Sequence, residues 1–221
     1  MKRLLPYILT SLLLIGFWKL RTWTDNYAFS PEGKELLMLD IALTSIFIYK
    51  TFFWLVIGNL TVFSYQTIRA KNYKVACFIC VLIITFYFAV GHFVDRKCAF
   101  HYFTVFHNQS VMEEFLESPI LEAGYQIGPI LTEKIADKTM KYRLYAIGGL
   151  EKLDYRPATP ILNKILLDKS EKDVFRANAF QALSTFDTDE TNKIITKFRQ
   201  QAVDSLDRKV IELGEYFIKN N

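Results

Sequence analysis

The segment that decides the fold is Leu166–Phe186, LLDKSEKDVFRANAFQALSTF. An earlier segment matches it with a shift of 33 residues, and the match continues into the residues that follow both. The paired positions are Arg143 and Arg176, Ala146 and Ala179, Ile147 and Phe180, Leu150 and Leu183, Leu153 and Phe186, Asp154 and Asp187, Ile161 and Ile194, Leu162 and Ile195, and Ile165 and Phe198. Preserved apolar spacing together with an Arg–Ala pair indicates a structural repeat, and about 30–47 residues is the length of helical-hairpin units.

Each copy has the pattern of two helices joined by a turn. In the first copy, positions 146, 149, 150 and 153 are apolar or small and fall on one helical face. The segment Asp154–Pro157 ends that helix, and Pro160 lies near the start of the next one. One hairpin cannot bury both apolar stripes, so we expect Tyr142–Phe198 to form two helix pairs packed side by side. A looser copy runs through 127–138, and a half-copy begins at Arg208.

The repeat resembles the short bacterial type of HEAT-like repeat, whose hairpins end in an Asp followed by an R-x-x-A-x-x-A-L pattern. The matching residues are Asp168, Arg176, Ala179, Ala182 and Leu183 in one unit, and Asp137, Arg143, Ala146, Gly149 and Leu150 in the other. The resemblance covers about Glu113 to Tyr216. It implies a short α-solenoid that binds another protein; a minority of such relatives are bilin lyases, and no residue pattern here selects that activity.

The acidic and basic residues of the repeats are interpreted as structural. We expect Arg143 to contact Asp137, and Arg176 to contact Asp168 and Asp173, with acid–arginine contacts joining successive inter-hairpin turns. Some of these acids can also cap helix starts.

Charge and apolar residues divide the 221-residue chain into two parts. Apolar residues make up 51% of the chain. Residues 1–97 contain 11 Lys and Arg against 5 Asp and Glu, a net charge of +6, whereas residues 98–221 contain 16 against 18, a net charge of −2. The repeat region therefore lacks the positive surface that nucleic-acid binding requires, and we expect no nucleic-acid partner.

The first part has the pattern of a membrane domain. Long apolar runs predict three transmembrane helices, at about 4–20, 41–65 and 75–94, because about 20 apolar residues span a bilayer. The predicted organisation is all-α: a transmembrane domain at 1–97, an aromatic juxtamembrane linker at 98–110, and a HEAT-like domain at 111–221.

Polar residues within or beside these spans are the candidate intramembrane site. Lys50 lies inside the second span, Asp40 at its start, and His92 near the end of the third. An unpaired charge at the bilayer centre costs about 2.5–3.5 kcal/mol on insertion scales, so Lys50 either extends to the interface or pairs with Asp40 or His92.

Basic residues in a short loop predict the orientation. The loop 66–74 contains Arg69, Lys71 and Lys74 and no acid, which is typical of a cytoplasmic loop. Three crossings then place the repeat domain on the other side, in the periplasm of a bacterial inner membrane.

Three other patterns are weaker. Cys77 and Cys80 form Cys-x-x-Cys between apolar residues, which favours packing over redox or zinc chemistry. Arg96 and His101 have the spacing of the HEPN type of ribonuclease, and Glu113 and Glu117 share one helical face. None has an oriented partner in the sequence, so we predict no catalytic residue, metal or cofactor, and no enzyme activity.

The functional hypothesis is a membrane-anchored module that binds a protein through its repeats. A sharper form is an immunity or regulatory protein that binds a toxin or a membrane complex. The alternative is an accessory subunit of a transporter or channel, which the polar residues near the membrane favour.

Overall fold

The described part of the chain is all-helical, which confirms the all-α part of the predicted fold class. The computed structural model describes residues 4–22, 32–110 and 115–220. These residues form α-helices and two short 3₁₀ helices, and they contain no β-strand. The chain divides into two compact units, Met1–Phe115 and Leu116–Asn221, which we call the N-terminal and C-terminal units.

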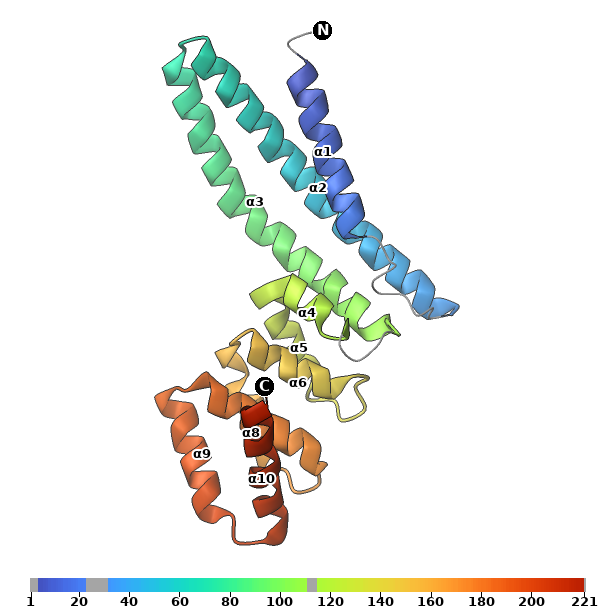
Figure 1. Cartoon of the computed structure of the whole chain (residues 1–221), viewed down its shortest axis with the longest axis vertical. Coiled ribbons are helices and arrows are strands. Elements are labelled where there is room, and N and C mark those ends of the chain that lie inside the picture. Colours follow the sequence, from blue (N-terminus) through green and yellow to red (C-terminus); the bar gives the residue numbers. More distant parts are fainter. Residues whose placement is uncertain (1–3, 23–31, 111–114, 221) are drawn as a thin grey trace. The chain divides into compact units, whose positions relative to one another are not determined.

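In the N-terminal unit, α1 (Leu5–Arg21) packs antiparallel on the second half of α2 (Lys34–Arg69) (Figure 1). Close to the start of α1, the Tyr7 hydroxyl donates to Gln66 at 3.1 Å. Near its end, the Lys19 ammonium lies 5.8 Å from the centre of the Phe47 ring. Residue numbers thus rise along α1 while they fall along α2, which fixes the antiparallel direction.

A tight turn folds α2 back onto α3 (Tyr73–Asn108). Lys71 in this turn has a left-handed backbone conformation with φ of 59°, and the Asn72 side chain accepts from the Val75 amide at 3.5 Å. Along the hairpin, the Phe53 ring lies 5.7 Å from the Phe86 ring between centroids. This long antiparallel pair is the core of the N-terminal unit.

Two of the described helices, rather than three, are long and apolar enough to cross a membrane. They are α2 and α3, with 36 residues each, and their most apolar 18-residue segments have mean hydropathies of 1.7 and 2.3. The helix α1 coincides with the first predicted span but has only 17 residues, which is short for a crossing. The predicted spans 41–65 and 75–94 lie inside α2 and α3.

Residues 98–108, predicted as part of a linker, are the last turns of α3. The prediction read these aromatic residues as an interfacial collar or a short linker and did not specify a helix. No Gly or Pro occurs between Gly91 and Pro119, so nothing in the sequence breaks the helix there.

The C-terminal unit consists of short helices, and each copy of the duplication forms a pair of α-helices, with an additional 3₁₀ turn in the first copy. One copy contains α6 (Arg143–Lys152), a 3₁₀ turn η4 (Arg156–Ala158) and α7 (Thr159–Leu167), and the other contains α8 (Asp173–Phe186) and α9 (Asp189–Gln201). The remaining elements are α4 (Ser118–Ala123), η3 (Gly124–Ile127), α5 (Gly128–Lys134) and α10 (Ser205–Asn220).

The helix α8 is the centre of this unit, because it packs on α6, α7, α9 and α10. Its apolar face, including Ala179, Phe180 and Leu183, is completely buried. The helix α6 also packs on α4, where Gly149 lies directly against Ile120. The first helices of successive pairs therefore contact one another in the order α4, α6, α8, α10.

The duplication extends to the backbone conformation. Asp154 and Asp187 occupy matching positions just after the first helix of each copy, and both have positive φ, 47° and 43°. The left-handed conformation at a helix end satisfies the last carbonyls and turns the chain, and Asp tolerates it better than most residues. Each copy thus ends its first helix in the same way.

Candidate functional site

Two buried arginines occupy equivalent places in the C-terminal unit. Arg143 donates from Nε to the carbonyl of Ile135 at 2.7 Å, and Arg176 donates from Nε to the carbonyl of Leu166 at 2.8 Å. Both acceptors lie at the end of the helix that precedes the arginine, where carbonyls lack a helical partner. Each arginine therefore ties the start of one hairpin to the end of the one before it.

The acids that pair with these arginines are not the predicted ones. Arg143 Nη1 lies 2.6 Å from Glu171 Oε2, and Arg176 forms an ion pair with Asp207. These acids follow their arginines by 28 and 31 residues; Glu171 belongs to the next inter-hairpin turn, and Asp207 lies in the first turn of α10. The acid–arginine contacts between successive hairpins are made by Glu171 and Asp207.

The predicted acids stabilise the turns themselves. The Asp137 carboxylate accepts from the amide and hydroxyl of Thr139 at 2.8 and 2.7 Å, and Asp168 accepts in the same way from Ser170 at 2.9 and 2.6 Å. These are side-chain turns of the Asx type. The hydrogen bond from the Thr139 hydroxyl holds the pKa of Asp137 below its ordinary value.

Lysines join one turn to the next. Lys138 donates to Asp168 at 2.6 Å, and Lys169 donates in the same way to Asp204. Lys138 is the main reason that the pKa of Asp168 lies far below its ordinary value, and Lys169 lowers the pKa of Asp204. Asp173 pairs with Lys209 instead of Arg176, at 2.9 Å. These contacts are all internal, and they hold the turns side by side.

A hollow of about 210 Å³ lies on the face formed by α6, α8 and α10. Its charged floor is Glu151, which accepts from Gln181 Nε2 at 3.1 Å and from Thr185 Oγ1 at 3.0 Å. Burial raises the pKa of Glu151, although the two hydrogen bonds oppose the shift. Glu151 forms no ion pair with any residue in the described ranges, whereas Glu117 on the rim pairs with Lys152.

Sequence reasoning missed this hollow. Glu151 follows Leu150 of the repeat stripe and matches Ser184 in the next copy, so the duplication itself marks it as different. The sequence feature that could have indicated the hollow is Glu151 itself, a single acid close to Gly148 and next to the stripe of apolar and small residues that contains Gly149.

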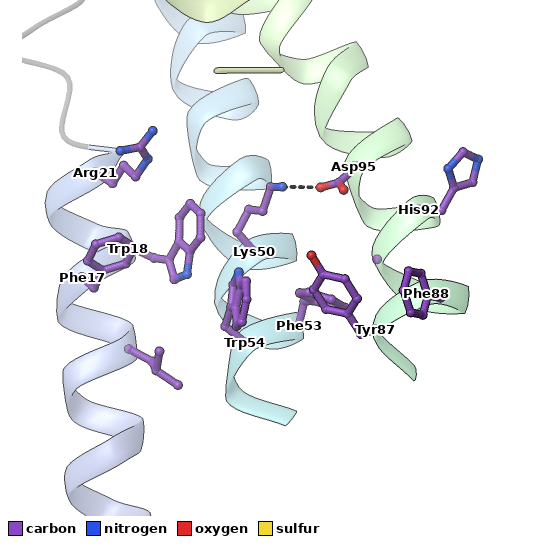
Figure 2. Close-up of a pocket in the computed structure, with 12 residues that line it drawn as sticks. Phe17, Trp18, Arg21, Lys50, Phe53, Trp54, Tyr87, Phe88, His92 and Asp95 are labelled. Carbon is purple, nitrogen blue, oxygen red and sulfur yellow. Dashed lines mark hydrogen bonds and ion pairs between the residues drawn. The ribbon is translucent and has the colours of Figure 1, made fainter. Parts of the chain in front are cut away.

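The N-terminal unit contains a larger groove, of about 840 Å³ (Figure 2). Side chains from α1, α2 and α3 line it, and most are aromatic: Phe17, Trp18, Phe53, Trp54, Tyr87 and Phe88. At one end lie Arg21, Lys50, His92 and Asp95. The groove therefore has a charged end and an aromatic remainder.

Lys50 pairs with Asp95, and neither predicted partner is the residue that it contacts. Figure 2 shows the Lys50 and Asp95 side chains directed toward each other and His92 directed away from the pair. Asp40 is exposed and lies on the same helix as Lys50, almost three turns earlier. Asp95 was missed because it lies beyond the predicted end of the third span.

The other candidate residues are dispersed. Cys80 contacts the Ser64 hydroxyl at 3.5 Å, and His101 stacks on Tyr49 with 6.0 Å between ring centres. Glu113 lies outside the described residues, and Glu117 is held by Lys152. Within residues 4–22, 32–110 and 115–220, no three His, Cys, Asp or Glu side chains come together as a metal site would require.

Comparison with known proteins gives no relative from which a function could be carried over: no family model, curated protein or solved structure matches the chain.

Proposed function

We propose that this is an integral membrane protein that binds another protein through its C-terminal unit. The proposed membrane insertion is supported by the exposure of apolar side chains on α3. Only 17% of the most apolar 18 residues of α3 are buried, and side chains such as Phe78, Val81 and Phe88 are more than half exposed. The core helix of a water-soluble protein buries its apolar residues, so a lipid surrounding accounts for α3 better.

Charged residues bracket an apolar layer of the right thickness. From Lys50 to Arg69 on α2 is 19 residues, or about 28 Å of helix, and from Lys74 to Asp95 on α3 is 21 residues, or about 31 Å. The hydrocarbon core of a bilayer is about 30 Å thick. In this placement Lys50 and Asp95 lie at the edge of the hydrocarbon, not at its centre.

The helix α1 is proposed as a third crossing of the same layer. It packs beside the bracketed half of α2 and ends in Lys19 and Arg21, near the level of Lys50. Its 17 residues extend about 25 Å, so the flanking residues complete the crossing.

The turn with Arg69, Lys71 and Lys74 is proposed to face the cytoplasm. The C-terminal unit then lies on the opposite side, which in a Gram-negative bacterium is the periplasm. A reporter enzyme fused after Asn221 tests this orientation: periplasmic activity supports it, and cytoplasmic activity reverses it.

The hollow with Glu151 is the observation that carries the binding function. A half-buried carboxylate with a raised pKa and no ion pair within the described residues is stabilised when a cation arrives. A Lys or Arg side chain of the partner protein has the required charge, and the amide of Gln181 and the face of α6, α8 and α10 provide the surrounding polar surface. The HEAT-like resemblance favours the same use, because α-solenoids bind partners along such faces.

The experiment is site-specific photocrosslinking in the native membrane. A crosslinker replaces Asn178 at the edge of the hollow, and a second chain carries it at Lys197, which is exposed on α9. We expect a defined crosslinked partner from position 178 only, and its loss in Glu151→Gln but not in the surface control Glu212→Gln. Equal capture of the partner by Glu151→Gln and Glu212→Gln would show that Glu151 is not the recognition point.

A sharper form of this proposal is an immunity or regulatory protein whose partner is a toxin or a membrane complex. Deletion of the chain should then produce a growth or competition defect that depends on the partner. The Glu151→Gln variant should fail to restore it, and Glu212→Gln should succeed.

The Lys50–Asp95 pair favours a second candidate, an accessory subunit of a transporter or channel, because paired charges near the membrane often belong to ion pathways. A Lys50→Leu/Asp95→Leu variant separates the two. It should abolish flux in the second candidate and leave partner crosslinking unchanged in the first.

A further inference from the structure

The groove of the N-terminal unit has an unusual order of side chains along its length. The α2 residues Phe53 and Trp54 lie between Trp18 of α1 and Tyr87 of α3 (Figure 2). The lining of the groove becomes less polar from the charged end toward Leu14 and Tyr87. Leu14 lies seven residues before Arg21 in α1, and Tyr87 lies eight residues before Asp95 in α3. The two ends are therefore separated by about 10–12 Å along the helices.

The charged end has a positive surplus. Arg21 and Lys50 contribute two positive charges, and Asp95 contributes one negative charge that is already paired with Lys50. Arg21 forms no ion pair within residues 4–22, 32–110 and 115–220. A guanidinium without a counterion at the edge of an apolar layer favours an anion, and a phosphate matches its planar set of donors.

The apolar end fits a hydrocarbon chain. Aromatic rings form most of its surface, and Gly91 lets α3 lie close to the Phe53 ring, because a Cβ there would lie only 3.3 Å from that ring. The volume of about 840 Å³ is within the range of about 300–1,000 Å³ typical of ligand sites.

We propose that this groove binds one anionic phospholipid, with its phosphate on Arg21 and Lys50 and an acyl chain along the aromatic surface. The proposal rests on the membrane placement argued above and is independent of the protein-binding function. A phosphate head and an apolar tail match the two ends of the groove, because the guanidinium of Arg21 pairs with a phosphate and the aromatic surface packs on a hydrocarbon chain. A transmembrane helix of a second copy would instead leave Arg21 in an apolar contact without a counterion.

The test is native mass spectrometry of the full chain purified in detergent. The protein is exposed separately to phosphatidylglycerol, to phosphatidylcholine with the same acyl chains, and to inorganic phosphate. We expect one phosphatidylglycerol molecule retained per chain, about tenfold weaker retention of phosphatidylcholine, and no displacement by millimolar phosphate.

Two variants with a matched control assign the contact. Arg21→Gln should weaken phosphatidylglycerol retention about tenfold, whereas Lys19→Gln, in the same helical turn but outside the groove, should not. Gly91→Leu should reduce retention of both lipids, because its side chain would displace the Phe53 ring that lines the groove. The unfolding midpoint of each variant is compared with that of the unmodified chain to show that the fold is intact. Equal retention of the two lipids, unchanged binding in Arg21→Gln, displacement by inorganic phosphate alone, or a dimer in place of a lipid adduct would each overturn the proposal.

Discussion

Arg143 and Glu171 form an ion pair of 2.6 Å between side chains that are only 2% and 5% exposed. The arginine begins α6 and the glutamate belongs to the turn before α8, so this contact connects the starts of two successive hairpins. Arg176 and Asp207 repeat it between α8 and α10. These pairs fix the stacking register of the C-terminal unit.

Removing one member of the buried pair should destabilise the chain strongly. Glu171→Ala leaves the Arg143 guanidinium buried without a counterion, and we expect a loss of about 3–5 kcal/mol in the free energy of unfolding. Replacing both with Arg143→Met/Glu171→Leu should restore part of that loss, because the charge is removed as well. Urea unfolding of the full chain in detergent measures both.

The exposed pair Arg199–Glu215 is the control for that series. Its side chains are 50% and 52% exposed, and Glu215→Ala should change the free energy of unfolding by less than about 1 kcal/mol. Similar losses at the buried and exposed pairs would contradict the role assigned to Arg143.

Two adjacent glycines in α6 should respond oppositely to alanine. A Cβ at Gly149 would lie 2.8 Å from Ile120, inside the α4–α6 contact, so Gly149→Ala should cost about 1–3 kcal/mol. At Gly148 the only near atom is the end of the Glu117 side chain, which can move, and Gly148→Ala should stabilise α6 by about 0.5–1 kcal/mol. Thermal unfolding of the two variants side by side measures the contrast.

The Asp168 carboxylate should stabilise the folded chain at neutral pH and lose this contribution at acid pH. Its folded-state pKa lies below the ordinary value because Lys138 and Ser170 donate to it. The contribution is therefore complete above the ordinary Asp pKa of about 3.9 and is lost as the pH falls below it.

Asp168→Asn is the variant that isolates this carboxylate, because it keeps the acceptor for Ser170 but removes the charge. The urea midpoint of the unmodified chain should fall more steeply between pH 5 and pH 2.5 than that of the variant. Identical slopes would mean that the Lys138 contact does not affect stability.

The charged form of Glu151 should lower the stability of the folded chain, whereas that of Asp168 raises it. Because burial raises its folded-state pKa, the charged carboxylate disfavours the folded state, and its effect is absent at low pH and appears as the pH rises through the ordinary Glu range. We expect Glu151→Gln to raise the unfolding midpoint at pH 7 and not at pH 3, while it weakens partner crosslinking. A variant that lowers stability at pH 7 would indicate that the carboxylate serves the fold.

The duplication predicted the local structure of the C-terminal unit because it is a local signal. Apolar spacing, the break after Leu153 and the proline of α7 each act within one helix or turn, and the structure has helices in those places. The left-handed Asp154 and Asp187 are also local, since both positions already match in the sequence.

Partner choice could not be predicted in this way. Whether Arg143 meets Asp137 or Glu171 depends on how far one turn slides past the next, which no spacing within a single repeat determines. The same limit applies to Lys50 and Asp95, which lie on separate helices and pair through the register of the α2–α3 hairpin. The hollow at Glu151 likewise forms only where α6 packs on α8, so no pattern within one helix predicts it.

Removing the charge of Asp95 should destabilise the folded chain more than removing the charge of Lys50. The Lys50 side chain is 17% exposed and the Asp95 side chain 47% exposed, so Asp95 can be hydrated alone more easily than Lys50. Asp95→Asn leaves a mostly buried ammonium without its counterion and should cost about 1–3 kcal/mol, whereas Lys50→Met should cost less. In thermal unfolding of the full chain in detergent, Asp95→Asn should have the lowest midpoint, and Lys50→Met/Asp95→Asn should recover toward Lys50→Met. If Lys50→Met were instead the more damaging single change, Lys50 would have to stabilise the groove through its methylene chain, and the ion pair would be secondary to that packing.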